Sequence, residues 1–289
     1  MKTIKKRVGT KAEIRAIKNR ERRIATAIFL TFILLIVVFS SYFTYNFLNQ
    51  PQNQTTNPAS SQLKAAIVDQ LSLTFPNQTF IETATNTLKQ AGYTVDYYAG
   101  EEVTVEFYRN LPTHGYSIII LRVHSSAAEL QGKEFVETPV GIFTSESYSQ
   151  TKYVYEQLTD QLVTASYTMP QPPYYFAIVP KFVTSSIKGT LQNTIIIMMG
   201  CEGLNNTKMA EAFIQKGAKA YIGWKGSVSA SHTDIATTRL LQHLIIEKQT
   251  INQAIENTMK EAGPDPSYKS VLLYYPSKVG EQTIENSER

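Results

Sequence analysis

Two residues that could form a catalytic pair each follow a run of apolar residues. His124 comes directly after SIIILRV, and Cys201, the only cysteine of the chain, comes directly after IIIMMG. A thiolate is a strong nucleophile, and a nearby imidazole favours the thiolate and can pass a proton to a leaving amine. If both runs are neighbouring parallel strands, their carboxyl ends meet at one edge of the sheet. The pair then predicts acyl transfer through a thiol.

The residues around this pair suggest how it would be supported. The main-chain amides of Ser125 and Cys201 could hold a developing oxyanion. A helix predicted from about Thr207 would also favour the thiolate through its N-terminus. Taken singly, each residue has a plainer explanation, since a lone cysteine on an apolar run is more often an inert core thiol.

Strand-like and helix-like segments alternate along most of the chain. The strand candidates are continuous apolar runs, as expected of strands buried on both faces, and the segments between them repeat apolar residues at helical spacing. This alternation predicts an α/β fold with a mostly parallel sheet and helices on both faces. We expect strands at 65–69, 94–99, 116–124, 194–200, 219–224 and 270–276 and helices at 79–91, 102–111, 207–216, 234–247 and 250–262.

Two capping boxes, Thr79 with Glu82 and Thr250 with Gln253, are expected to begin two of these helices.

Residues 125–193 interrupt the alternation, so we interpret them as an insertion. A hairpin is expected at 133–145, a helix at 152–164 and an irregular tyrosine-rich segment after them. The insertion is either a lid that recognises substrate or a structural elaboration that covers one edge of the sheet.

The order of these features resembles the caspase-like cysteine peptidases of clan CD, in particular their gingipain-like and CHAT-type members. The resemblance rests on the two strand ends and on the helix-strand segment MAEAFIQKGAKAYIGWKGSVS after the cysteine. It implies a caspase-like three-layer sandwich, His124 as the catalytic histidine and Cys201 as the nucleophile of a thioacyl-enzyme. The chain departs from the family in having Ser125 where many members have Gly, Glu202 where caspases have Arg, and a longer segment between the two catalytic residues.

Members of that family read the residue before the cut bond in a deep pocket. Asp69 and Glu202 lie near the expected cleft, and an acidic pocket would suit Arg or Lys. Trp224 could form the floor of this pocket, and His232 could line it or replace His124 as base. The plainer interpretations are solvated or capping carboxylates, a core tryptophan and a histidine at a helix cap.

The N-terminal part of the chain has a different composition. Ten of the residues in 1–23 are Lys or Arg, and the stretch 24–43 is apolar and uncharged. At about 1.5 Å per residue, a helix of this length crosses a hydrocarbon core of about 30 Å. The basic flank places the N-terminus in the cytoplasm and the remaining chain outside. A cleaved signal peptide is the alternative, although its apolar region is usually shorter.

These patterns predict five parts. They are a basic cytoplasmic segment at 1–23, a transmembrane helix at 24–47, a polar linker at 48–62, a caspase-like α/β domain at 63–280 and a C-terminal tail at 281–289.

Composition also restricts the partners that we expect. With one cysteine no internal disulfide can form. The sequence has no clear metal-ligand spacing, phosphate-binding glycine loop or basic-aromatic pattern. We therefore expect no metal, cofactor or nucleic acid, and we expect a peptide or protein substrate and a membrane contacted through 24–47. The alternatives are a non-catalytic binding or signalling module that presents 125–193, and a two-lobed solute-binding domain.

Overall fold

The computed structural model describes residues 29–40, 63–127, 138–168 and 171–284. The chain divides into two compact units, residues 1–60 and 61–289, and each is described by itself. In the first unit, residues 29–40 are helical and their apolar side chains are exposed. No helix among the described residues is long and apolar enough to cross a membrane. The predicted segments 1–23 and 48–62, both ends of the predicted span 24–47 and the tail from residue 285 lie outside the described residues.

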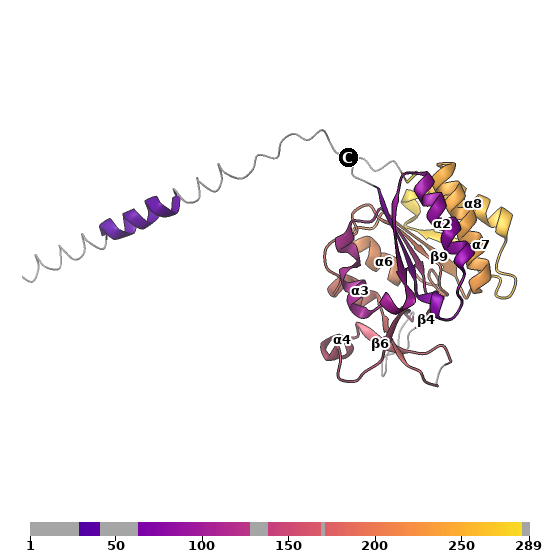
Figure 1. Ribbon diagram of the computed structural model, residues 1–289, viewed down its shortest axis with the longest axis horizontal. Helices are drawn as coiled ribbons and strands as arrows, with labels where there is room; N and C mark the ends of the chain where they lie inside the picture. Colours follow the sequence, from indigo (N-terminus) through magenta and orange to yellow (C-terminus); the bar gives the residue numbers. More distant parts are fainter. Residues whose placement is uncertain (1–28, 41–62, 128–137, 169–170, 285–289) are drawn as a thin grey trace, which may run out of the picture. The chain divides into compact units, whose positions relative to one another are not determined.

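The second unit is built on a six-stranded sheet, here called sheet A (Figure 1). Its strand order is β10-β9-β8-β3-β1-β2, and every neighbouring pair is parallel except β10 with β9. The prediction of a mostly parallel α/β sheet is confirmed. The strands are β1 (Lys64–Asp69), β2 (Thr94–Ala99), β3 (Ile118–Arg122), β8 (Ile195–Met198), β9 (Ala220–Lys225) and β10 (Val271–Tyr275).

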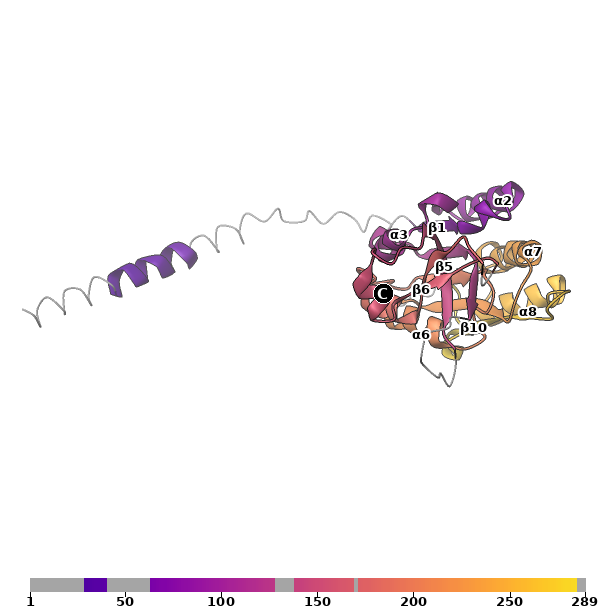
Figure 2. The same cartoon turned by 90° about the horizontal axis from the view of Figure 1, so that it is seen from below.

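Helices cover both faces of sheet A, as Figures 1 and 2 show. Because side chains alternate along a strand, Ile118 and Ile120 of β3 join one apolar core, while Ile119 and Leu121 join the other. The first core contains side chains of α2 (Gln78–Gln90), α7 (Ala230–Leu241) and α8 (Ile251–Ala262). The second contains side chains of α3 (Val105–Asn110), α5 (Pro180–Ser185) and α6 (Lys208–Gln215).

Short helical turns complete the unit. They are the 3-10 helices η1 (Gln70–Leu73), η2 (Gly100–Glu102), η3 (Leu111–His114) and η5 (Ser277–Val279), and the π-helical turn η4 (Gln242–Ile246).

Helix boundaries follow the capping residues. The Thr250–Gln253 capping box is confirmed at the start of α8. The box predicted from Thr79 is wrong, because Asn77 caps α2 instead, with its side chain accepting from the amide of Phe80 at 3.1 Å. Asparagine is among the best N-cap residues, so the helix starts earlier than the Thr-x-x-Glu pattern suggested.

Residues 125–193 contain a second sheet, here called sheet B, which is antiparallel with the order β4-β5-β7-β6. The hairpin predicted at 133–145 is wrong in its pairing, since β5 pairs with β4 and residues 128–137 lie outside the described residues. The helix predicted at 152–164 is shorter, since Asp160 adopts a φ of 55° and a strand follows. The elements are β4 (Ser125–Ala127), β5 (Val140–Ser147), α4 (Val154–Leu158), β6 (Leu162–Ala165) and β7 (Tyr175–Ile178).

Candidate functional site

His124 and Cys201 follow neighbouring strands at matching positions. Strands β3 and β8 pair in parallel, and Leu121 and Met198 form their last paired position. Each reactive residue lies three residues beyond that position, at the carboxyl end of its strand. The condition for the predicted pair, that its two strands be neighbours, is therefore met.

The imidazole of His124 is held by the loop after β1 and covered by aromatic rings. Its Nε2 lies 2.9 Å from the Thr74 hydroxyl oxygen, and its main-chain N–H donates to Gln70 Oε1 at 2.9 Å. Its ring centroid lies 4.6 Å from that of Tyr167 and 6.0 Å from that of Phe75. Burial, and the positive charge of Arg122 next, lower the pKa of His124 to about 4. The imidazole is therefore neutral near pH 7, in the protonation state of a base, and is less basic than a free imidazole.

The thiol of Cys201 contacts a different loop. Its Sγ accepts a hydrogen bond from the amide of Val228 at 3.4 Å and lies 3.5 Å from the carbonyl oxygen of the same residue. Burial raises the pKa of Cys201 despite the favourable amide contact. Helix α6 begins at Lys208, within one residue of the predicted start, whereas the amide that contacts the thiol belongs to Val228, just before the N-cap of α7. Among the hydrogen bonds of the described residues, none joins this thiol to His124.

Ser125 connects the two strand ends. Its hydroxyl donates a hydrogen bond to the main-chain carbonyl of Cys201. The amide of Phe143 donates to the carbonyl of His124, so His124 and Phe143 form a hydrogen-bonded pair of the antiparallel ladder. Pairs alternate in such a ladder, so the amide of Ser125 points away from β5, toward the free edge of β4. This orientation suits the expected oxyanion donor.

The close approach of the two strand ends requires a glycine at position 200. A Cβ there would lie 2.3 Å from the Ser125 hydroxyl oxygen and 2.5 Å from the carbonyl oxygen of Val123. Only a residue without a side chain leaves room for the contact between Ser125 and the chain at Cys201.

Asp69, expected to line a substrate pocket, belongs to a buried ion cluster. Its Oδ1 lies 2.7 Å from Nη1 of Arg122, and its side chain is 1% exposed. The other side of the same guanidinium makes two 2.8 Å bonds to the carboxylate of Asp234. The sequence analysis missed Arg122, although a charged residue inside an apolar strand needs a buried partner and could have indicated this cluster.

Of the remaining predicted pocket residues, Trp224 and His232 pack together, with ring centroids 5.4 Å apart. Glu202 adopts a φ of 63°, and its Oε1 accepts from the Ser227 hydroxyl at 3.0 Å. Trp224 is fully buried, and its Nε1 donates to Thr233 at 2.9 Å, which makes it a core residue. His232 lies in the first turn of α7 and is 8% exposed. Of the predicted catalytic residues, the structure places Ser125 against the main chain of Cys201 and His124 at the end of the neighbouring strand, with Glu202 next to the cysteine in sequence.

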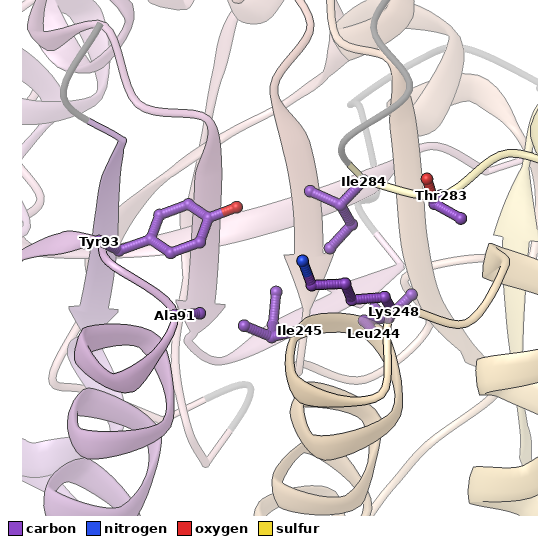
Figure 3. A pocket seen from close by; sticks show the side chains of 7 residues that line it. All are labelled: Ala91, Tyr93, Leu244, Ile245, Lys248, Thr283 and Ile284. Atoms are coloured by element: carbon purple, nitrogen blue, oxygen red, sulfur yellow. The ribbon is translucent and has the colours of Figure 1, made fainter. Parts of the chain in front are cut away.

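A cleft of about 800 Å³ adjoins His124 on sheet B. Its lining includes Ser125, Phe143 and Tyr167, but not Cys201. A second cavity, of about 20 Å³, lies near Tyr93, Ile245 and Lys248 and has room for about one water molecule (Figure 3). Of these two, the cleft beside His124 is large enough to take a substrate side chain.

No protein-family model matches the chain, and no curated protein matches it. Among the described residues, no group of three or more His, Cys, Asp or Glu side chains is arranged to hold a metal ion.

Proposed function

We propose that the chain is a cysteine endopeptidase of caspase-like fold, with Cys201 as the nucleophile and His124 as the base. The observation that carries this proposal is the matching position of the two residues at the carboxyl ends of adjacent parallel strands. Ligands of such sheets bind at this edge. The glycine at position 200 and the Ser125 contact keep the two strand ends close.

The reaction starts from a neutral thiol and a neutral imidazole. His124 takes the thiol proton as Cys201 Sγ attacks the carbonyl carbon of the peptide bond. The amides of Ser125 and Cys201 stabilise the resulting oxyanion. The imidazolium then gives its proton to the leaving amine, and a thioacyl-enzyme remains. Water, deprotonated by the same imidazole, hydrolyses the thioester and restores the thiol.

This mechanism requires the thiol of Cys201 to leave its present partner, while His124 keeps its own. The thiol exchanges its contacts with Val228 for the imidazole, while Thr74 keeps Nε2 of His124 and leaves Nδ1 for the thiol. Substrate binding is the event that we expect to drive this rearrangement.

We further propose that the peptidase is anchored in a membrane and faces outward. The apolar stretch 24–43 and the basic segment 1–23 support a single span with a cytoplasmic N-terminus. The polar linker 48–62 would hold the catalytic domain away from the bilayer.

Turnover of peptides by the full-length protein in detergent micelles tests the proposal. Fluorogenic peptide pools with Arg, Lys, Asn or Asp before the cut bond are the substrates. We expect Cys201→Ala and His124→Ala each to reduce kcat/KM by about a thousandfold or more. His114→Ala, at the opposite end of β3, should leave turnover unchanged. Equal turnover by wild type and both site variants would reject the proposed dyad.

A non-catalytic binding or signalling module on the same scaffold is the second candidate. It is favoured by the raised pKa of Cys201 and by the contacts of its thiol with Val228. This candidate predicts no turnover of any pool by wild type and no reaction of the thiol with iodoacetamide until the protein is denatured.

A further inference from the structure

The cleft beside His124 is bordered by the two edge strands of sheet B. Its lining includes the consecutive residues 124–127 at β4 and the consecutive residues 160–167 around β6, with the exception of residue 161. A strand that presents only one face to a cleft contributes every second residue. Contributions from successive residues therefore mean that the main chain of both strands, and not one face alone, borders this cleft, which we call the trough.

The floor of the trough is apolar. Phe143 and Ala177 from the two central strands form it, together with Ala165, Val163 and Tyr167 at the β6 side. Beside Phe143, the central strands present only Gly141 and Ala177, which leave room for the side chains of a bound chain.

The edge of β6 carries main-chain groups that face the trough. The amide of Val179 donates to the carbonyl of Gln161, which marks a hydrogen-bonded pair between β7 and β6. By alternation, Leu162 and Thr164 form the non-bonded pairs with β7, so their N–H and C=O groups point to the free edge. In the part of the chain that the structure describes, no strand pairs with this edge. Such an edge pairs readily with an extended peptide.

The charges of the trough narrow the class of ligand. The described lining contains no Lys or Arg, and its only carboxylate is Asp160. His124 is neutral near pH 7 because its pKa is lowered to about 4. Among the described lining residues, no side chain offers a counter-charge to a phosphorylated or strongly acidic ligand, whereas an uncharged extended peptide suits both the floor and the edge.

Tyr167 joins the trough to the imidazole. Its ring lines the trough and lies 4.6 Å from the ring of His124. Its hydroxyl accepts a hydrogen bond from Gln70 Nε2, and Oε1 of the same Gln70 accepts from the His124 amide. A peptide in the trough would thus lie directly beside the proposed base.

We propose that the trough binds an extended, uncharged polypeptide segment by strand addition to β6, and that this segment belongs to the substrate. The statement about substrate rests on the proposed peptidase function. The statement about peptide binding stands on the edge, the floor and the charges of the trough.

The test measures binding separately from cleavage. The probes are two fluorescein-labelled pools of eight-residue peptides, one with uncharged residues only and one with Asp or Glu at three positions. Binding to the full-length Cys201→Ala protein is followed by fluorescence anisotropy. Thr164→Pro removes the outward amide of β6, and Thr164→Val is the matched control that keeps it. Val163→Trp fills the trough and serves as a second variant if Thr164→Pro lowers the melting temperature.

We expect Cys201→Ala to bind the uncharged pool at least about tenfold more tightly than the acidic pool. Thr164→Pro should weaken binding about five- to tenfold, the size of one lost hydrogen bond, while Thr164→Val stays within about twofold. Undiminished binding in both Thr164→Pro and Val163→Trp, or no binding of the uncharged pool, would overturn the inference. Binding without any turnover by wild type would instead reject the peptidase and leave the peptide site intact.

Discussion

The hydroxyl of Ser125 donates a hydrogen bond to the main-chain carbonyl of Cys201, so the residue after the proposed base is tied to the proposed nucleophile. The bond crosses from the first strand of sheet B to the end of β8 in sheet A. It is a direct link between the two strand ends that would carry the chemistry, and it makes Ser125 a positioning residue as well as the proposed oxyanion donor.

Replacing Ser125 with Ala should therefore lower kcat clearly and reduce the free energy of unfolding only slightly. Loss of the hydroxyl removes one net hydrogen bond, which is about 1 kcal/mol of unfolding free energy. The main chain at Cys201 is then less well held, and we expect kcat to fall about tenfold with a smaller change in KM. Peptide turnover and urea unfolding of the variant measure the two effects.

Ser267→Ala is the matched control, because that side chain is exposed and does not line the trough. It should behave as wild type in both measurements. Wild-type kcat in Ser125→Ala would show that the contact with Cys201 has no part in the reaction.

The reactivity of Cys201 should follow the buried environment of its thiol. Burial raises its pKa, so iodoacetamide should modify it mainly above the ordinary thiol value of about 8.5. The label is unambiguous because the chain has one cysteine. Since the imidazole makes no hydrogen bond to the thiol among the described residues, His124→Ala should not move the pH midpoint of labelling. A midpoint well below 8.5 that rises in His124→Ala would instead reveal a resting thiolate–imidazolium pair.

The buried imidazole of His124 should make the folded protein sensitive to mild acid. Its pKa is about 4 in the folded state, against about 6.5 in an unfolded chain. Below pH 6.5 the unfolded chain binds a proton that the folded protein does not bind until about pH 4, so stability falls as pH falls through this window. Between pH 7 and pH 5 the loss from this group is roughly 1 to 2 kcal/mol.

Urea unfolding of wild type and His124→Gln at the two pH values measures this loss. The variant lacks the titrating group, so its decrease in stability should be smaller by that amount, while the other histidines contribute equally to both proteins. Identical decreases would mean that His124 is protonated as easily in the folded state as in the unfolded chain.

The strands of sheet A and the helices that cover it could be predicted because the sequence patterns that mark them are local. Apolar runs mark buried strands, and the Thr250–Gln253 box marks a helix start within a few residues. The same pattern misled at Thr79, since Asn77 competes for the cap and is the stronger N-cap residue. The pairing of β4 with β5 in sheet B depends on contacts across the sheet, which spacing along the chain does not reveal.

The candidate site was predictable in position but not in detail. Strand order brings His124 and Cys201 to one edge, as their place after apolar runs implied. Their hydrogen-bond partners, Thr74 and Val228, come from other loops and depend on side-chain rotamers. The ion cluster of Arg122 could not be predicted from spacing along the chain either, because its partners are 53 and 112 residues away in sequence.

The ion cluster beneath the site should contribute far more to stability than an exposed ion pair does. The side chain of Arg122 is fully buried between the carboxylates of Asp69 and Asp234, with contacts of 2.7 and 2.8 Å. Arg122→Met would leave two buried carboxylates without their cation, which costs about 3 to 5 kcal/mol.

Arg239→Met is the matched control, since its 3.5 Å pair with Glu261 is about half exposed and contributes less than about 1 kcal/mol. Urea unfolding of both variants measures the difference, and adding Asp69→Asn to Arg122→Met should restore part of the loss by removing one uncompensated charge. Equal stability of the two arginine variants would mean that water compensates the buried carboxylates.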